Sequence, residues 1–427
     1  MIETLNNLFN NIELSWIDSV IDIDKSDEFF NLLQIFPNLK KIFQNAQEIN
    51  KEEFQRTIKH IFRSFKIFFL INNGTFSHET LSQESITKIR EKVLKQHSKN
   101  SLLIPILLMY HDIGRYIDNK EHPYHSYQLI TNKGLLKSFE LSDVEKLLLR
   151  KLIQYHLLMA TIYTGESTFY GIYSLLNDKE FLELRSHENA TNKFVDLLEV
   201  FTYIDILGYV YTKIFDHYVK YYDEINNKLK RILSHLPDKK RALKIAKEYS
   251  QEWLEWRLAG ALRIFQFVET KPYLTKEFYY EKLEDSLKQS DNQLIKDLNW
   301  DLLKDKYLIH SYKIQMRYSL ALLMILAFGN FQRMGLKINT GISYKLILFW
   351  MILSKEITSR SENNPKAIWN VYFKGMPHWS KIDKSFISML NDDIIESLIQ
   401  SSEYEYNHQK EEYNLYIDLN TIIHKIF

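Results

Sequence analysis

Histidine and aspartate residues recur within or beside apolar segments between residues 60 and 205. The pair His111-Asp112 is the most distinctive, because it ends the apolar run Leu102–Met109 and is closely followed by Gly114. In chain order, the full series is His60, His111-Asp112, His125, His156 and Asp205. Burying an ionised carboxylate among apolar residues costs several kcal/mol unless it is paired or bound to a metal. We therefore interpret the series as the ligands of a metal site.

Residue composition narrows the chemistry of such a site. The chain of 427 residues contains no cysteine, which excludes disulfides, thiolate chemistry and cysteine-based zinc or iron–sulfur centres. Half of its 14 histidines lie between His60 and His156. Neutral imidazoles suit Zn, Fe, Mn, Co and Ni, and carboxylates extend the range towards Mn and Mg. We expect one or two divalent cations from this group, and the residue types leave their identity open.

Each of these residues has an ordinary structural explanation when it is considered alone. A single histidine on an apolar helix, such as His60, is more often a hydrogen-bonded core residue than a metal ligand. Asp205 alone could cap a helix or pair with a lysine or arginine, and His125 alone could be a solvated loop residue. The joint recurrence of the residues with their flanking segments favours a shared site over these separate explanations.

The segments that carry these residues are predicted to be helical, because their apolar residues recur at the spacing of one helix face. Gly74 supplies a stop signal for the first segment. The second is apolar on almost every side, which is typical of a buried central helix. Ser142 and Glu145 form a capping-box pattern that starts the third. The four segments are residues 51–72, 101–110, 143–156 and 191–220.

Glycine (11) and proline (7) are scarce, which favours an all-α fold because strand-and-turn folds use both residues often. A boundary is expected within Leu233–Lys240, where Pro237 and Asp238 interrupt the pattern. The clearest helices beyond it are Arg241–Phe267, Met316–Met334 and Ser343–Thr358. We predict three parts, namely an N-terminal helical segment (1–50), a metal-binding domain (51–235) and a C-terminal helical domain of unknown role (236–427).

Charge and hydropathy exclude several classes of protein. The net charge of +1 provides no bulk positive field for nucleic acid or an anionic membrane, and no nucleic-acid-binding motif is evident. The apolar stretch between Arg317 and Arg333 contains Asn and Gln and is too short to span a bilayer comfortably. The N-terminus lacks the basic segment of a secretory signal, so we expect a cytoplasmic protein. No glycine-rich loop of the Walker or dinucleotide-binding kind is present.

The segment Leu-Leu-Met-Tyr-His111-Asp112-Ile-Gly-Arg resembles the defining motif of the HD phosphohydrolase superfamily. More narrowly, residues 50–225 are similar to the HD domain of the bacterial uridylyltransferase/uridylyl-removing enzymes. The supporting segments are Thr57-Ile-Lys-His60, His125-Ser126, His156-Leu-Leu-Met159 and Thr202-Tyr-Ile-Asp205-Ile. The resemblance implies an HD-domain helical bundle with additional N- and C-terminal helices. No nucleotidyltransferase signature is seen upstream of this region, and no clear α/β regulatory domain is seen downstream of it.

The resemblance also implies roles for individual residues. A primary metal would be bound by His60, His111, Asp112 and Asp205. A second metal or a phosphate would be bound by His125 and His156. His78 is an alternative first ligand, because shorter HD domains often place one about that far before the His-Asp pair, but His60 has the better-matching apolar flanks. Arg115 stands where a lysine often follows the His-Asp-x-Gly motif, and arginine can bind phosphate bidentately.

These roles imply a metal-dependent phosphohydrolase, and we expect a phosphodiesterase that acts on a nucleotide or nucleotidyl-linked substrate. A metal lowers the pKa of its bound water from 15.7 towards about 7, which makes hydroxide available at neutral pH. Asp112 reaches two metals most naturally, since it adjoins His111. The expected catalytic residues are Asp112, Arg115, His125 and His156. His122 and Lys151 are further candidates for contacts with phosphate oxygens.

The alternative is a non-catalytic sensor or scaffold. Its HD-type site would bind a nucleotide or a metal without turnover, and the C-terminal helices would bind a partner. The long C-terminal region, which carries no recognisable chemistry of its own, motivates this alternative. The complete ligand series favours the enzyme, because a site without catalysis is free to lose its ligands.

Overall fold

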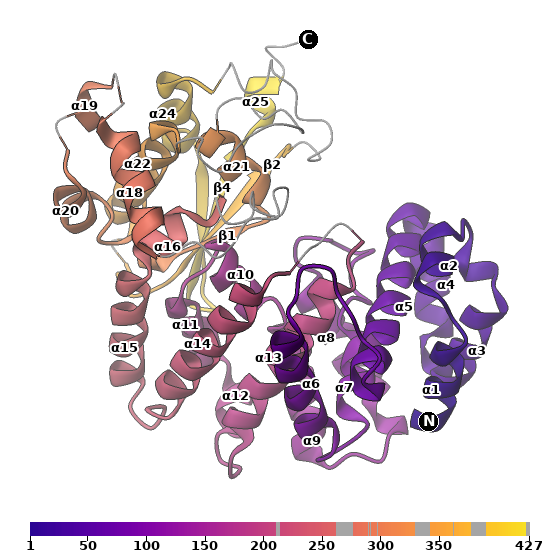
Figure 1. The fold of residues 1–427 in the computed structure, drawn as a ribbon. Helices are drawn as coiled ribbons and strands as arrows, with labels where there is room; N and C mark the ends of the chain where they lie inside the picture. The colour runs from indigo at the N-terminus through magenta and orange to yellow at the C-terminus, as the bar shows by residue number, and fades with distance from the viewer. Residues whose placement is uncertain are drawn as a thin grey trace. The chain divides into compact units, whose positions relative to one another are not determined.

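The computed structural model describes residues 1–210, 214–261, 276–288, 290, 292–296, 298–328, 342–361, 363–376 and 390–423. The chain is mostly helical and divides into two compact units (Figure 1). Unit 1 comprises Met1–Met159 with Glu180–Lys230, and unit 2 comprises Ala160–Lys179 with Arg231–Phe427. This division differs from the three predicted parts, because residues 1–50 belong to unit 1 and residues 160–179 to unit 2.

Unit 1 is a helical bundle in which α5, α7 and α13 pack against one another. Its helices are α1 (Ile2–Asn10), α2 (Leu14–Ser19), α3 (Asp27–Ile35), α4 (Lys40–Ile49), α5 (Lys51–Asn73), α6 (Gln83–His97), α7 (Leu103–Tyr110), α8 (His122–Lys133), α9 (Asp143–Gln154) and α13 (Ala190–Leu207). Helices α10 (Leu158–Thr164), α12 (Lys179–Leu184) and α14 (Asp216–Leu233) include the points where the chain passes from one unit to the other.

Local signals explain where the site-bearing helices begin and end. The Asn50 side chain caps α5 by accepting a hydrogen bond from the Glu53 amide at 3.1 Å. Gly74 ends α5 with φ +75°, a conformation that glycine adopts without a steric penalty. At the start of α9, Ser142 and Glu145 each accept a hydrogen bond from the backbone amide of the other, which is the predicted capping box. The helix predicted over 51–72 is thus confirmed, and the one predicted over 143–156 is confirmed as far as Gln154.

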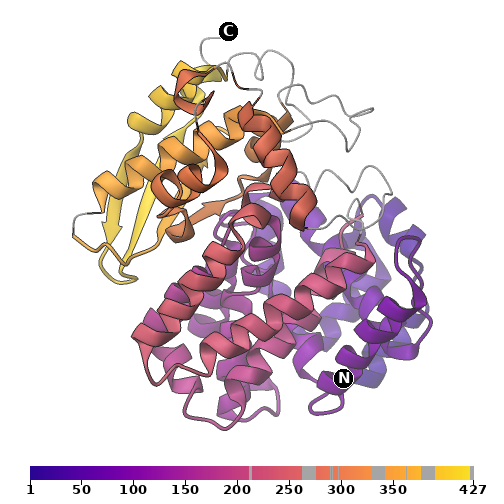
Figure 2. The same cartoon turned by 60° about the vertical axis from the view of Figure 1, so that its left-hand side comes forward.

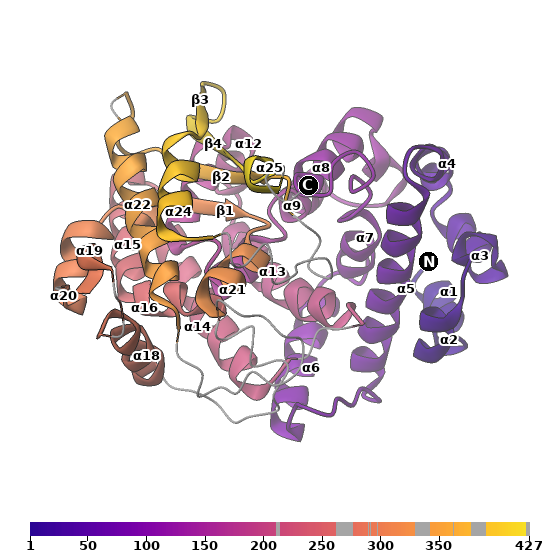
Figure 3. The ribbon, with the colours of Figure 1, turned by 90° about the horizontal axis from the view of Figure 1, so that it is seen from above.

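The first fifty residues are part of unit 1 because they cover a second apolar face of α5. Helices α1, α2, α3 and α4 gather on one side of α5 (Figure 3). The ring of Phe9 stacks on Phe65 with centroids 4.9 Å apart, and the buried ammonium of Lys66 donates to the Phe9 carbonyl at 3.0 Å. A long helix that is apolar on more than one face needs cover on each of them, and this N-terminal segment supplies it.

Unit 2 contains a four-stranded sheet, so the prediction of an all-α fold was wrong for this part of the chain. The strands are β1 (Ile314–Arg317), β2 (Trp369–Lys374), β3 (Glu403–Asn407) and β4 (Glu412–Asp418). Their order is β1-β2-β4-β3, with β1, β2 and β4 parallel and β3 antiparallel to β4. Figure 2 shows the orange and yellow strands of this sheet from a second side. Trp369 pairs with Tyr413 in the register, and their rings stack at 4.3 Å. Short apolar strands that are buried in a parallel sheet resemble helix segments in sequence, which explains the error.

The helices of unit 2 include η4 (Phe169–Gly171), α11 (Ile172–Asn177), α15 (Lys239–Glu252), α16 (Leu254–Leu258), α18 (Lys276–Lys288), α19 (Gln293–Lys296), α20 (Trp300–Leu302), η6 (Leu303–Tyr307), η7 (Ser311–Lys313), α21 (Leu320–Phe328), α22 (Tyr344–Arg360), α24 (Asp392–Gln400) and α25 (Asn420–Ile423). Helix α22 confirms the prediction over 343–358. The helix predicted over 241–267 is divided into α15 and α16, and its residues 262–267 lie outside the described residues.

The helix predicted over 316–334 is only partly correct. Its first residues belong to β1, and Tyr318 then adopts φ +54° before α21 begins at Leu320. Residues 329–334 lie outside the described residues. Throughout the described part of the chain, no helix has both the length and the apolar character that a membrane crossing requires.

Candidate metal centre

Segments from five parts of unit 1 bring six histidine and aspartate side chains together. His60 lies in α5 and Asp205 lies near the end of α13. The other four are His111 and Asp112 directly after α7, His122 at the start of α8, and His156 just beyond α9. All six are buried, and the most exposed, Asp205, has only 6% of its surface accessible. Their atoms form two groups of three in which the candidate ligand atoms lie within 4.8 Å of one another.

The first group consists of His60, His111 and Asp205. His60 Nε2 lies 2.8 Å from Asp205 Oδ1, and His111 Nε2 lies 3.3 Å from the same oxygen. The rings of the two histidines meet edge to face with centroids 5.4 Å apart. Two imidazole nitrogens and one carboxylate oxygen therefore converge on a small buried volume.

The second group consists of Asp112, His122 and His156. His122 Nε2 lies 3.0 Å from Asp112 Oδ1 and 3.2 Å from His156 Nε2. The other oxygen of the same aspartate, Oδ2, lies 3.4 Å from His111 Nε2. Asp112 therefore presents one oxygen to each group, which is the arrangement of a carboxylate shared between two neighbouring sites.

Backbone hydrogen bonds orient three of the imidazoles. The Nδ1 atoms of His111, His122 and His156 lie 3.0, 2.7 and 2.8 Å from backbone carbonyl oxygens three residues upstream. A carbonyl can only accept, so each Nδ1 carries the proton when the ring is neutral, and each Nε2 keeps its lone pair. The Nε2 atoms point into the two groups. Fixing of the outer nitrogen in this way is typical of histidines that ligate metals.

Two buried polar atoms at the centre have no hydrogen-bond partner, which bears on whether a cation fits between these residues. His111 Nε2 and Asp112 Oδ1 are buried, and neither forms a hydrogen bond. Buried polar atoms without partners are rare and call for a specific explanation. Nitrogen and oxygen donors with two carboxylate charges suit a first-row transition metal such as Mn or Fe, and the chain has no cysteine thiolate to compete. The residues present therefore fit one or two divalent cations.

Electrostatics within the site agree with this donor set. Burial opposes the charged form of Asp205, but its close contacts with His111 and His60 outweigh burial and hold the pKa of this carboxyl well below its usual range. Burial and the neighbouring His122 and His111 lower the pKa of His156 to about 3, which keeps the imidazole neutral as a ligand must be.

His111 behaves differently from His156. Burial lowers its pKa, but the negative charges of Asp112 and Asp205 outweigh burial and raise the pKa to about 10. A cation that binds Nε2 of this ring must therefore displace a proton, so metal affinity at this group should fall as pH falls.

The Arg115 side chain forms hydrogen bonds with residues in and around the two His/Asp groups. Its Nη1 donates to Asp112 Oδ2 at 3.0 Å and to the Tyr209 hydroxyl at 3.1 Å, and its Nε donates to Glu53 Oε1 at 2.8 Å. The Tyr209 ring stacks on the His60 ring with centroids 4.1 Å apart. This arginine therefore links one ligand, Asp112, to the aromatic cover of another.

Two glycines let the chain pass close to the ligands. A Cβ added at Gly114 would lie 2.4 Å from the Ser126 amide nitrogen, and the Gly114 amide itself donates to Ser126 Oγ at 2.9 Å. A Cβ added at Gly208 would lie 2.3 Å from Ser64 Oγ and 3.0 Å from His60 Cε1. Glycine is required at both positions by close packing, and at Gly114 the main-chain contact leaves no room to adjust.

The structure brings together five of the six predicted ligands, namely His60, His111, Asp112, His156 and Asp205. It does not bring His125 into either group, and His122 is present in its place. Residues three positions apart on a helix project to similar faces, so spacing alone could not separate the two histidines. Pro123 marks the first turn of α8 and could have indicated that His122 lies nearest the loop that carries Asp112.

The remaining candidates lie elsewhere in unit 1. His78, the alternative first ligand, contacts Thr80 through its Nδ1 and belongs to neither group. Lys151 is buried, and its ammonium lies 2.8 Å from both Glu180 Oε2 and Gln154 Oε1. Glu180 therefore pairs with the ammonium of Lys151, which the sequence had suggested as a phosphate contact.

Comparison with known proteins identifies no relative of this chain. No protein-family model matches it, and no curated protein and no solved structure matches it either.

Proposed function

We propose that this chain is a metal-dependent phosphohydrolase, and specifically a phosphodiesterase that acts on a nucleotide or nucleotidyl-linked substrate. The observation that carries the proposal is the position of Asp112, which presents one carboxylate oxygen to each of two buried His/Asp groups. Paired metal sites of this kind are common among enzymes that cleave phosphate esters. The resemblance of the segment around His111-Asp112 to the HD motif supports the same reaction class.

In this proposal each group holds one cation. The ligands would be His60, His111 and Asp205 at one position, His122 and His156 at the other, and Asp112 between them. Bound divalent cations would polarise a phosphate oxygen and lower the pKa of a water molecule towards neutrality. The protein orients three of these ligands, His111, His122 and His156, through the backbone carbonyls that accept from their Nδ1 atoms.

Arg115 and Glu53 act as positioning residues in this scheme. The guanidinium of Arg115 holds Asp112 Oδ2 at 3.0 Å, and Glu53 in turn holds the guanidinium at 2.8 Å. Glu53 is itself buried, with 6% of its surface exposed. The sequence-based role of Arg115 as a phosphate ligand is therefore replaced, in this proposal, by a role in fixing the shared carboxylate.

A sensor that binds ligand without turnover is the second candidate. Unit 2 has no part in the His/Asp groups, yet it contains a polar cavity of its own. A separate unit with a separate cavity is the architecture expected of a protein that couples ligand binding to another event. Turnover by the purified protein distinguishes the enzyme from this alternative.

The first experiment measures bound metal by plasma mass spectrometry, in protein purified without a chelator or a histidine tag. Wild type should hold about one or two transition-metal ions per chain, as two clusters of three ligands imply. Asp112→Ala should lose them, because both groups share this carboxylate. Asp143→Ala is the matched control, since the Asp143 side chain is fully exposed at the start of α9 and its one ion pair among the described residues is with Lys146.

Hydrolysis of bis(p-nitrophenyl) phosphate and p-nitrophenyl phosphate should then be measured with Mn, Fe, Co, Ni, Zn and Mg. Activity in wild type and Asp143→Ala, together with its loss in Asp112→Ala, supports the phosphohydrolase. Retained metal without cleavage of either ester or of a nucleotide panel contradicts it and favours the sensor. Wild type that takes up no metal even after reconstitution would contradict the metal-dependent enzyme and leave the sensor or scaffold in the lead.

A further inference from the structure

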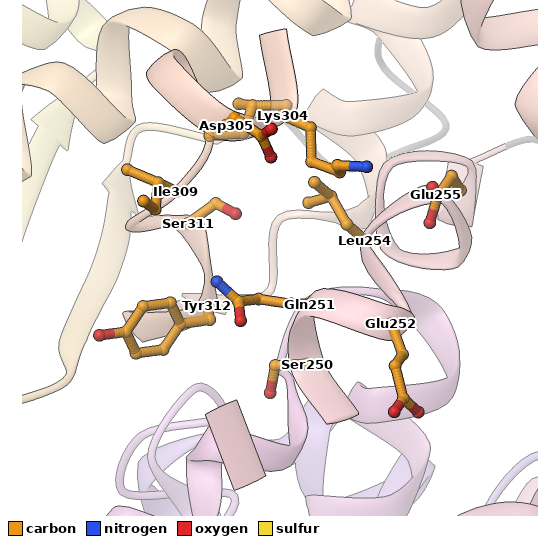
Figure 4. Close-up of a pocket in the computed structure, with 11 residues that line it drawn as sticks. Ser250, Gln251, Glu252, Leu254, Glu255, Lys304, Asp305, Ile309, Ser311 and Tyr312 are labelled. Atoms are coloured by element: carbon orange, nitrogen blue, oxygen red, sulfur yellow. The ribbon is translucent and has the colours of Figure 1, made fainter. Parts of the chain in front are cut away.

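A cavity of about 380 Å³ opens among three segments of unit 2. They are the junction of α15 with α16, the turn η6 with the residues that follow it, and the turn η7. The volume lies within the range of sites for small molecules, about 300–1,000 Å³. Figure 4 shows the Gln251 amide, the Asp305 carboxylate and the Ser311 hydroxyl directed towards a common space. We call these three groups, one from each segment, the polar triad.

Ser311 is the buried member of the polar triad, with 2% of its surface exposed. Its backbone amide donates to the Leu308 carbonyl at 2.9 Å, and its carbonyl accepts from the Arg257 guanidinium. Its hydroxyl lines the cavity and forms no hydrogen bond with any of the described residues. Buried hydroxyl groups normally have a partner, so this one indicates a ligand that enters the cavity.

The other two members of the polar triad are exposed where they line the cavity. Among the residues that the structure describes, neither the Gln251 nor the Asp305 side chain has an ion-pair or hydrogen-bond partner. Asp305 lies in η6, a π-helical turn in which the Leu308 amide donates to the Leu303 carbonyl at 3.0 Å. Turns of this kind are rare and occur frequently at functional sites. The carboxylate and the amide are therefore available to a ligand.

The charges in and beside the cavity balance one another. The lining contains three carboxylates and one ammonium group, which belong to Glu252, Glu255, Asp305 and Lys304. Two more lysines lie beside the lining, because Lys247 is 5.2 Å from the centroid of the Tyr312 ring and Lys313 follows Tyr312 in the chain. Three carboxylates are thus offset by three ammonium groups. A neutral ligand suits such a cavity better than an anion or a cation does.

Hydroxyl groups complement the polar triad because they both donate and accept hydrogen bonds. A carboxylate only accepts, whereas an amide and a hydroxyl do both. An ammonium group only donates, so it would leave the N–H groups of Gln251 without an acceptor. A phosphate only accepts, and the carboxylate of Asp305 would repel it. Several neighbouring hydroxyls on one ligand satisfy all three members of the triad.

The same cavity also has an apolar part. Leu254 and Ile309 line it, and Ile309 leaves 39% of its surface exposed. Small-molecule sites combine apolar lining with a few polar groups that fix the orientation of the ligand. A ring that carries hydroxyls at its edge and C–H groups on its faces matches this combination.

We propose that this cavity of unit 2 binds a small neutral polyol of monosaccharide size. Asp305 would accept hydrogen bonds from the hydroxyls of the ligand, and Gln251 and Ser311 would both donate to them and accept from them. Leu254 and Ile309 would contact a C–H face. The site lies wholly within unit 2 and uses no residue of the metal centre, so the proposed phosphohydrolase and this site can fail independently.

The test is a saturation-transfer NMR titration of the full chain with glucose, galactose, mannose, ribose and myo-inositol, in the presence of a chelator. At least one of these polyols should bind with a Kd of about 1 mM or below. Asp305→Asn should weaken binding by at least about tenfold, because a hydrogen bond to a charged acceptor is lost. Ser311→Ala should weaken it by about threefold to tenfold. Both variants should fold, since neither side chain has a partner among the described residues, and circular dichroism checks this.

Glu248→Gln is the matched control, because it removes one negative charge from α15 at a residue that lies outside the lining. Its one ion pair among the described residues is with Lys244. It should leave affinity within twofold of wild type. Absence of binding by all five polyols overturns the proposal, as does binding that Asp305→Asn and Ser311→Ala both leave unchanged. Binding of putrescine or AMP without binding of any polyol overturns the assignment of a neutral ligand.

Discussion

Helix α13 carries two buried carboxylates, Glu199 and Asp205, whose surroundings differ in kind. Glu199 accepts from the Lys92 ammonium at 2.7 Å, the Asn226 amide at 2.8 Å and the Tyr203 hydroxyl at 3.1 Å. Asp205 is comparably buried, but it faces the imidazoles of His60 and His111. The Glu199 carboxylate thus accepts hydrogen bonds from a side-chain cation and two neutral donors. The Asp205 carboxylate lies among residues that can also bind a metal.

The difference teaches that burial of a carboxylate does not by itself indicate a functional site. The decisive feature is the chemistry of the neighbours. Lysine and amide groups only donate hydrogen bonds to Glu199, so they complete a structural network. The imidazoles near Asp205 have Nε2 atoms that can act as ligands, and Asp112 adds a second carboxylate to the same place. This contrast leads to five predictions, which begin with the largest expected effect.

Removal of metal should destabilise the end of α13 near Asp205 and leave the Glu199 network intact. A cation that binds only the folded chain stabilises it by about 4 kcal/mol when the free metal is 1,000 times Kd. Thermal unfolding with metal and with chelator should show that shift in wild type and in Glu199→Gln, but not in Asp205→Asn. An equal metal-dependent shift in Asp205→Asn would show that stabilisation arises elsewhere.

The affinity for metal should also depend on Asp205 and not on Glu199. Asp205→Asn removes a charged ligand, so metal affinity should fall by more than about 100-fold, since loss of a supporting residue alone costs 10–100-fold. Glu199→Gln should retain wild-type affinity. Competition with a chromophoric chelator measures both values, and a large loss in Glu199→Gln would contradict the assignment of Glu199 to structure.

The pH dependence of stability should report on Glu199. Burial raises its pKa to about 7, above the ordinary value of 4.5. The folded state therefore binds the proton more tightly, so its stabilising contribution is complete below pH 4.5 and is lost as pH rises through 7. Relative to wild type, Glu199→Gln should gain about 3 kcal/mol in unfolding free energy between pH 4.5 and pH 8. Urea denaturation of chelated samples measures the difference, and a constant difference across this range would oppose the prediction.

Gly208→Ala should disturb the Asp205 end of the helix through packing alone. Gly208 has φ −68°, so alanine meets no backbone strain, but its Cβ would collide with Ser64 Oγ and press on His60. We expect a loss of about 1–3 kcal/mol in unfolding free energy, with weaker metal binding. Adding Ser64→Ala removes the closest contact and should restore part of both quantities. No recovery in the double variant would mean that the collision is relieved in another way.

Arg115→Lys should have the smallest effect. Lysine keeps the positive charge near Asp112 but cannot hold Asp112, Glu53 and Tyr209 together with one planar group. Metal affinity should fall by about tenfold, the lower range for a residue that orients a ligand. Arg150→Lys is the control, since Arg150 pairs with Glu180 away from the two His/Asp groups. Equal losses in both variants would argue against a positioning role for Arg115.

Prediction from sequence succeeded where local chemistry dominates. The cap at Ser142, the stop at Gly74 and the apolar spacing of residues 51–72 are local signals, and the corresponding helices are present. It failed where distant segments decide the outcome. Strand β2 lies between β1 and β4, and its residues pair with partners 55 positions before them and 44 positions after them, so pairing leaves little trace in any short window. Residues 160–179 likewise belong to unit 2 with residues far along the chain.

The amino-acid sequence alone determined that several ionisable residues must be buried within apolar helices, because helical periodicity is a local property that each segment carries with it. Which atoms meet is a matter of ångströms, and it depends on how α5, α7, α9 and α13 pack. Tertiary packing therefore placed His122, and not His125, in the second group, and it turned Asp112 towards both groups. It also gave Asp205 imidazole neighbours and Glu199 a lysine neighbour. The physical reason is that a helix sets the direction of a side chain, whereas only its neighbours set what that side chain can bind.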